Sequence, residues 1–312
     1  MNMNPRYFDL QVNGYAGVDF NQDNLPAEGL HHACTKMEED GVDGFMATIV
    51  TDTIEVMERR LARLVALRQQ DDLASRVIAG LHIEGPFINP EEGYRGAHPV
   101  DAICPANRSD AERLLEAAGG LARIVTLAPE MDKDLAVTRW LVEQGVVVSA
   151  GHCNPSMDQL DAALDVGLSM YTHLGNGCPM TLNRHDNIIQ RVLSRAERLW
   201  ICFIADGVHV PSYALATYLQ LAGDRAIVVS DAMSAAGLGP GSYTLGRWTV
   251  EVGEDLAAWA PNRAHLVGSA MNLPQMNEVL KKGCNTTATR RNALTSVNPR
   301  RALGLPCKTE EL

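Results

Sequence analysis

The stretch VIAGLHIEGP, residues 77–86, decides the fold. It is an almost continuous apolar run that ends in a glutamate, Glu84, followed at once by glycine and proline. A strand that is buried on both faces has this pattern, and such strands are typical of parallel sheets. An unpaired carboxylate at the end of a buried strand is costly, so Glu84 needs a cation, a proton or a functional role.

Apolar runs of the same kind recur along the chain, and a stretch with helical periodicity follows each of them. The expected strands are 7–14, 44–51, 77–85, 123–130, 146–152, 168–176, 200–209 and 226–233. The expected helices are 27–40, 53–70, 108–118, 133–144, 155–166, 187–197, 211–222 and 272–283. This alternation in 312 residues predicts an α/β protein with a (β/α)8 barrel of the TIM type. A doubly wound open sheet is the alternative, but no glycine-rich phosphate loop follows the first strand.

Two long segments interrupt the alternation. We expect one barrel domain over residues 1–312, with loops at about 86–107 and 234–270. The second loop contains a predicted hairpin, SYTLGRWTVEVGE. Long loops on the C-terminal face of a barrel commonly cover an active site.

Composition excludes several classes of function. The net charge of −11 argues against a nucleic-acid partner, which would require a basic surface. No apolar run approaches the roughly 20 residues of a membrane span, and the first residues, MNMNPRYFDL, do not resemble a signal peptide. The seven cysteines are scattered without a CxxC pair, as in a reducing compartment. We therefore expect a cytoplasmic protein with no nucleic-acid or membrane partner.

Residues that can carry chemistry gather at the ends of the expected strands. They are Gln11, Asn13, Glu84, His152, His173, Asp206, His209 and Asp231. In a barrel these ends meet at one face, so one glutamate and two histidines from three strands form a His2Glu set, as in a catalytic divalent metal site. A free aspartate from a neighbouring strand can then transfer protons. This hypothesis explains Glu84 as a residue that faces a metal ion.

Structural interpretations of the same residues stay open. Glu84 could form a salt bridge with Arg95, and His152 could cap the helix that follows it. His82 lies on the same side of its strand as Glu84 and is interpreted as a core residue or as support for the ligands. Asp206 could orient a neighbouring side chain instead of reacting.

Nine stretches together resemble a known family: FDLQVNGYAGVDF, LHIEGPFIN, GAH, VTLAPE, SAGHCN, THLGNG, IADGVHV, VSDAM and LVGSAM. Their order and rough spacing, from residue 7 to about 305, resemble the N-acetylglucosamine-6-phosphate deacetylase family of the amidohydrolase superfamily. The resemblance implies a metal-dependent deacetylase whose substrate is an amino-sugar phosphate.

The resemblance also implies residue roles. Glu84, His152 and His173 would bind one divalent metal ion per chain, Asp231 would be the acid and base, and His209 would polarise the acetyl carbonyl. The implied contacts to the sugar come from His98, Asn176, Gly177 and the backbone near Leu266, Val267 and Gly268. Arg184 would bind the phosphate, across the interface of a homodimer.

The sequence departs from the pattern of its superfamily in three places. Gln11 and Asn13 stand where many amidohydrolases have an HxH pair, and amides bind metal ions weakly, so we expect one tight metal and assign both amides to the substrate site. THLGNG replaces the more usual THLYNAM, which could enlarge the sugar pocket at Gly175 and Gly177. The family's small β-sandwich, built from both termini, is expected to be absent because the first strand begins at residue 7 and the chain ends soon after RRALGL.

Two other functions remain as alternatives. A related amide or cyclic-amide hydrolase, similar to a D-aminoacylase, would not need Arg184. A non-catalytic barrel that only binds a ligand would not need Glu84, His152, His173 and Asp231 together. Zinc is the expected metal, although iron, manganese and cobalt also accept a His2Glu set. The identity of the sugar stays open as well.

Overall fold

Eight parallel strands form the central sheet of the computed structural model, which describes residues 6–263 and 265–307. In sheet order they are β1 (Tyr7–Val12), β4 (Val42–Val50), β5 (Ile78–Glu84), β6 (Ala122–Leu127), β7 (Val147–Ala150), β8 (Met170–Tyr171), β9 (Trp200–Ile204) and β10 (Ala226–Val229). Each coincides with one of the predicted strands. Their side chains are almost all buried, as the continuous apolar runs require.

The first and last strands meet and nearly close the sheet into a barrel. The Asn13 amide nitrogen donates to the Ala232 carbonyl at 2.7 Å, and Val12 and Ala232 form a parallel bridge. The Ser230 amide donates to the Asp9 carboxylate at 3.1 Å. The predicted (β/α)8 barrel is therefore confirmed.

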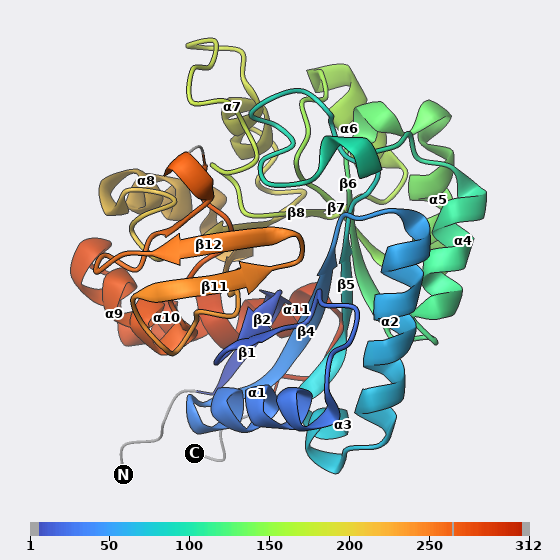
Figure 1. Cartoon of the computed structure of the whole chain (residues 1–312). Helices are drawn as coiled ribbons and strands as arrows, with labels where there is room; N and C mark the ends of the chain where they lie inside the picture. The colour runs from blue at the N-terminus through green and yellow to red at the C-terminus, as the bar shows by residue number, and fades with distance from the viewer. Residues whose placement is uncertain (1–5, 264, 308–312) are drawn as a thin grey trace.

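The helices surround the strands, as Figure 1 shows for α2, α4 and α5. The predicted helices correspond to α1 (Ala27–Glu39), α2 (Ile54–Gln69), α4 (Arg108–Ala117), α5 (Ala136–Glu143), α6 (Met157–Asp165), α7 (Ile188–Leu193), α8 (Ser212–Ala222) and α9 (Leu273–Gly283). Capping boxes begin two of them, at Ser156 with Gln159 and at Asn272 with Gln275. The helix α5 begins later than predicted because Asp134 and Leu135 have positive φ angles of 56° and 53°.

Several short elements were not predicted, because they are too short to show a period of their own. The additional helices are α3 (Asp72–Val77), α10 (Ala288–Asn292), the π-helix η6 (Ala293–Val297) and α11 (Asn298–Ala302). Single 3-10 turns are η1 (Val100–Ala102), η2 (Pro129–Met131), η3 (Lys133–Leu135), η4 (Gly223–Arg225) and η5 (Pro261–Arg263). No helix in the described ranges is long and apolar enough to cross a membrane.

The predicted hairpin is present between β10 and α9. Strands β11 (Gly241–Leu245) and β12 (Trp248–Val252) are antiparallel, and β13 (Ala258–Trp259) pairs with β12. Figure 1 shows this sheet in orange, outside the barrel strands. A separate small pair, β2 (Gly14–Tyr15) and β3 (Val18–Asp19), follows β1.

Candidate active site

The ends of β5, β7 and β8 bring together the three residues of the expected metal site. Glu84 is the last residue of β5, and its Oε1 lies 3.1 Å from His173 Nε2 and 3.5 Å from His152 Nε2. The two Nε2 atoms are 3.1 Å apart. All three side chains are buried. Convergence from three strands is what the strand-end pattern predicted.

A fourth side chain, His98, joins this group from the loop after β5. Its Nε2 lies 3.2 Å from His152 Nε2, and one ligand atom each from Glu84, His98 and His152 lie within 4.8 Å of one another. The sequence analysis assigned His98 to the sugar and did not place it beside the expected ligands. Strand periodicity carries no information about a loop residue, so the pattern could not show this proximity.

Hydrogen bonds to the other ring nitrogens determine where the protons of two histidines lie. His152 Nδ1 lies 2.8 Å from the Tyr94 carbonyl, which can only accept, so Nδ1 carries the proton. His98 Nδ1 lies 2.7 Å from the Thr51 hydroxyl, which itself donates to the Glu84 carbonyl, so this Nδ1 also donates. An imidazole whose single proton is on Nδ1 has a lone pair on Nε2, and the Nε2 atoms of His98 and His152 face each other across 3.2 Å.

This donor set fits a divalent cation. Facing lone pairs repel unless a proton or a cation lies between them. Tetrahedral ligands at zinc–nitrogen distances of about 2.0 to 2.1 Å are roughly 3.4 Å from each other. The separations of 3.1–3.5 Å among Glu84, His152 and His173 are close to this value. The Tyr94 carbonyl accepts a hydrogen bond from His152 Nδ1. Contacts of this kind fix the orientation and the protonated nitrogen of an imidazole that binds a metal.

The Glu84 carboxylate and the His173 imidazole each stabilise the charged form of the other. Burial opposes ionisation of Glu84, but its contacts with the imidazoles of His152 and His173 outweigh burial and hold its pKa well below the usual value. Burial also opposes the charged form of His173, yet the contact with Glu84 raises its pKa.

Arg95 does not form the alternative salt bridge with Glu84. Its guanidinium donates to the Pro90 carbonyl at 3.1 Å.

Backbone strain marks the same strand ends. His152, His173 and Asp231 have φ angles of 51°, 34° and 49°. Residues other than glycine rarely adopt this left-handed region, and such strain is often concentrated at functional sites.

Asp231, two residues after β10, lies beside the group and is buried. Burial and the charge of Glu84 raise its pKa to about 6. The Asn13 amide donates to its Oδ1 at 2.7 Å, while the Gln11 amide donates to Glu84 Oε1 at 3.0 Å. The Asn13 oxygen is buried and finds no hydrogen-bond partner among the described residues, so it is an unpaired acceptor.

Asp206 orients His209, as its structural interpretation suggested. The carboxylate Oδ2 lies 2.6 Å from His209 Nδ1 and accepts from the Ser269 hydroxyl at 2.9 Å. Burial opposes both charges, but their attraction lowers the pKa of Asp206 to about 2 and raises that of His209. The Nε2 atom of His209 is thereby left available for another partner.

His82 belongs to the barrel core. Its Nδ1 lies 3.1 Å from the Leu10 carbonyl and its Nε2 lies 2.7 Å from the Thr126 hydroxyl. Burial lowers its pKa to about 4, so the ring is neutral. These contacts agree with the interpretation of His82 as a core residue.

Gly177, the second of the two glycines in THLGNG, packs against a histidine. A Cβ atom added to Gly177 would lie 2.8 Å from His152 Nδ1, so the absence of a side chain allows close contact at this point. The neighbouring Asn176 amide donates to the His173 carbonyl at 3.2 Å. The imidazole therefore occupies space that the sequence analysis expected to enlarge the sugar pocket.

The segment from Leu266 to Gly268 lies next to Asp231. The amide that follows it, of Ser269, donates to the Asp231 carbonyl at 2.8 Å. A Cβ atom on Gly268, whose φ is 61°, would lie 3.1 Å from the same carbonyl oxygen. Val267 is buried, whereas Leu266 is partly exposed.

Arg184 is not part of this group. It lies exposed in the loop between β8 and α7 and forms no ion pair within the part of the chain that the structure describes. The nearby Asp186 pairs with Arg191 instead, whose Nε lies 2.6 Å from the Asp186 carboxylate.

Comparisons with known proteins agree with this geometry. No protein-family model matches the sequence. The chain is 33% identical to the human N-acetylglucosamine-6-phosphate deacetylase over 310 residues, covering 96% of this chain and 74% of that protein. It is 29% identical to the N-acetylgalactosamine-6-phosphate deacetylase of Escherichia coli O157:H7 over 301 residues, covering 96% and 78%. The crystal structure of N-acetyl-D-glucosamine-6-phosphate deacetylase from Mycobacterium smegmatis superposes with a TM-score of 0.87 at 28% identity, covering 97% of this chain and 79% of that one.

An eight-stranded parallel barrel with acidic and histidine side chains at its strand ends defines an enzyme fold of the amidohydrolase type. Within that class, the chain belongs to the N-acetylglucosamine-6-phosphate deacetylase family.

Proposed function

We propose that this protein is a metal-dependent N-deacetylase that converts N-acetylglucosamine 6-phosphate into glucosamine 6-phosphate and acetate. The observation that carries the proposal is the convergence of Glu84, His152 and His173 within 3.1–3.5 Å, with the buried Asp231 beside them. A variant of the M. smegmatis relative binds N-acetyl-D-glucosamine-6-phosphate in its crystal structure, which supports the choice of substrate.

Glu84, His152 and His173 would hold one divalent cation, for which zinc is the first candidate. When bound, such a cation lowers the pKa of a coordinated water and polarises a carbonyl group. His98 is close enough to contact either the cation or the sugar. Gln11 and Asn13 remain assigned to the substrate side because their amides donate to the carboxylates, and Asn13 keeps a free acceptor.

The chain's own residues supply the proton transfers. Asp231, with a pKa raised toward neutrality, accepts the proton of the attacking water. It then returns this proton to the nitrogen of the leaving amino sugar. His209, held by Asp206, donates a hydrogen bond to the acetyl oxygen as negative charge develops there.

The remaining assignments concern substrate binding and assembly. Asn176, Gly177 and the backbone of Leu266, Val267 and Gly268 would contact the sugar. Arg184 would bind the phosphate of the neighbouring subunit's substrate in a homodimer, which agrees with its exposure and its lack of an ion pair in the described chain. A cytoplasmic location is supported by the seven cysteines, each of which is free.

An acetate-release assay over N-acetylated sugars, each with and without a 6-phosphate, tests the proposal. We expect turnover of N-acetylglucosamine 6-phosphate above all other substrates. Preference for an N-acylated D-amino acid would instead identify a D-aminoacylase-like hydrolase. Ligand binding without acetate release from any compound, in metal-loaded protein, would identify a non-catalytic barrel.

A further inference from the structure

The tip of the β11–β12 hairpin is held by three consecutive residues, and each contacts a different segment of the barrel's active-site face. The Gly246 amide donates to Asp19 Oδ2 at 2.7 Å. Arg247 forms an ion pair with Asp52, which follows β4. The Trp248 indole donates to the Ala97 carbonyl at 2.7 Å, in the loop after β5. A two-residue turn with this many contacts is anchored on the barrel and does not project freely into solvent.

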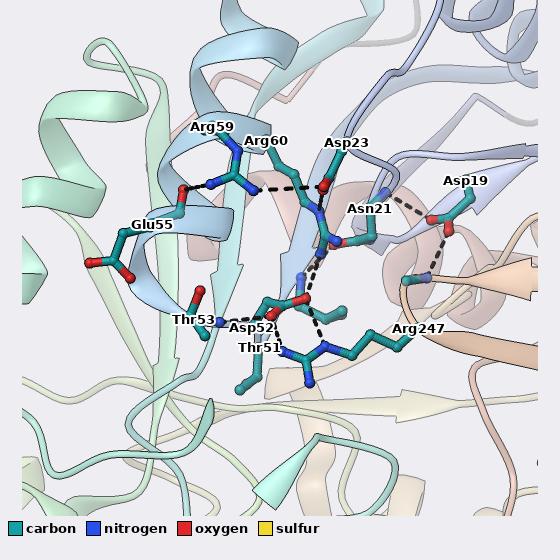
Figure 2. Close-up of polar contacts among 12 residues, drawn as sticks. Asp19, Asn21, Asp23, Thr51, Asp52, Thr53, Glu55, Arg59, Arg60 and Arg247 are labelled. Atoms are coloured by element: carbon teal, nitrogen blue, oxygen red, sulfur yellow. Dashed lines mark hydrogen bonds and ion pairs between the residues drawn. The ribbon is translucent and has the colours of Figure 1, made fainter. Parts of the chain in front are cut away.

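The Arg247 contact is directed at a buried carboxylate. Two nitrogens of Arg247, Nη2 and Nε, meet the two oxygens of Asp52, and the Nε distance is 3.2 Å. Arg60, almost fully buried on α2, approaches Asp52 from the other side at 3.2 Å. Figure 2 shows both guanidinium groups converging on Asp52. A bidentate pair on a buried carboxylate restricts geometry far more than an exposed ion pair does.

Both anchored segments lie next to His98. Thr51, adjacent to Asp52, accepts the hydrogen bond of His98 Nδ1 at 2.7 Å. Ala97, which receives the Trp248 indole, directly precedes His98 in the chain. Arg247 Nη1 also donates to Asp101 Oδ2 at 2.9 Å, three residues beyond His98. The loop that carries His98 contains only the single turn η1 as regular structure, so these contacts replace the support that a helix or strand would give.

We propose that the β11–β12 tip positions His98 in the active site, with Arg247 and Trp248 as the positioning residues. The tip holds the two neighbours of the His98 ring, the Thr51 segment on one side and the Ala97 carbonyl on the other. The consequence for substrate binding rests on the deacetylase function proposed above, whereas the anchoring itself does not.

Hydrogen-exchange mass spectrometry tests the anchoring without any activity. Trp248→Phe removes the indole N–H and keeps an aromatic ring, and Arg247→Met removes the guanidinium but keeps most of the stem. We expect amide exchange in peptides covering residues 93–104 to be roughly tenfold faster in each variant, because the Ala97 carbonyl or the Asp52 and Asp101 carboxylates lose their contact with the tip. The matched controls, Trp259→Phe and Arg263→Met, change the same residue types in the same insertion and should leave these peptides unchanged. Wild-type exchange in 93–104 for both tip variants would overturn the proposal.

Steady-state kinetics then test whether the anchoring acts through His98. Trp248→Phe should raise KM for N-acetylglucosamine 6-phosphate by roughly tenfold and change kcat much less, with metal content and thermal stability near wild type. In a His98→Ala background the same substitution should change KM by less than about twofold, because the ring it positions is gone. If the KM changes of Trp248→Phe and His98→Ala simply multiply in the double variant, the tip does not act through His98. An inactive wild type would refute the deacetylase function and leave the exchange result to decide on the anchoring.

Discussion

The Asn13 amide donates a hydrogen bond of 2.7 Å to the Asp231 carboxylate, although 218 residues separate them in the chain. The contact links the segment after the first barrel strand to the segment after the last one, at the face where Glu84 and the histidines meet. The hydrogen bond uses Oδ1 of Asp231, so Oδ2 is not part of it. A buried carboxylate with a pKa of about 6 can accept a proton from water and return it near neutral pH.

Replacement of Asp231 by asparagine should remove this proton transfer. Asp231→Asn keeps size and polarity but cannot accept the proton, so we expect turnover to fall by roughly 10²–10⁴, the usual range for a positioned acid or base. Metal content should be unchanged, and Asp255→Asn on the exposed part of the insertion serves as the control. Turnover within a few-fold of wild type would assign the acid and base role to another group.

The purified protein should hold about one equivalent of divalent metal per chain. The amides of Gln11 and Asn13 donate to Glu84 and Asp231 and are weak metal ligands, so the first strand does not offer the imidazole pair that a second tight site uses. Elemental analysis of the protein, and of Glu84→Gln, measures this directly. The variant should lose most of its metal. Two firmly held equivalents would contradict the single site, and none after reconstitution would contradict the site itself.

Arg184 should matter only for a phosphorylated substrate. Arg184→Ala should raise KM for the 6-phosphate and barely change turnover of the unphosphorylated analogue, because the guanidinium pairs with phosphate. The exposed Arg301→Ala is the control. Equal effects on the two substrates would remove the phosphate role.

The dimer makes a separate test of the same residue possible. If Arg184 acts across the interface, mixing Arg184→Ala with Asp231→Asn subunits should restore activity, since each hybrid dimer then has one intact site. A fully active monomer would exclude the arrangement in trans.

The buried Asp9 should make stability depend on pH. Burial raises the pKa of Asp9 to about 7, whereas an unfolded aspartic acid releases its proton near pH 4. The folded protein therefore binds more protons between these values, and the free energy of unfolding falls as the pH rises from about 4 to about 7. Asp9→Asn should remove this contribution.

Urea denaturation at pH 5 and pH 8 measures the effect of Asp9. We expect the fall in unfolding free energy between pH 5 and pH 8 to be about 3 kcal/mol smaller in Asp9→Asn than in wild type, because the pKa of Asp9 lies about two units above pH 5 and one unit corresponds to about 1.4 kcal/mol. Asp224→Asn, at a fully exposed position, should not change the difference. If the unfolding free energy changes equally between pH 5 and pH 8 in Asp9→Asn and in wild type, another group is responsible for the pH dependence.

Tertiary structure decided the features that lie in loops. The proximity of His98 to His152 depends on a loop held by Thr51 and by the hairpin tip, and neither contact has a signature in local sequence. The role of Gly177 was interpreted as extra space, but the fold brings the His152 ring against it. The unpredicted α3 and α10 are too short for hydrophobic periodicity to reveal them.

The sequence by itself determined the barrel, because continuous apolar runs alternating with amphipathic stretches allow few arrangements other than parallel strands covered by helices. It also determined that Glu84, His152 and His173 would share one face, because the carboxyl ends of parallel strands lie together. Only the tertiary structure decided which nitrogen of His152 and of His98 is free, through the Tyr94 carbonyl and the Thr51 hydroxyl. The physical reason is that strand register follows from local periodicity, whereas hydrogen bonds between loops depend on the packing of distant segments.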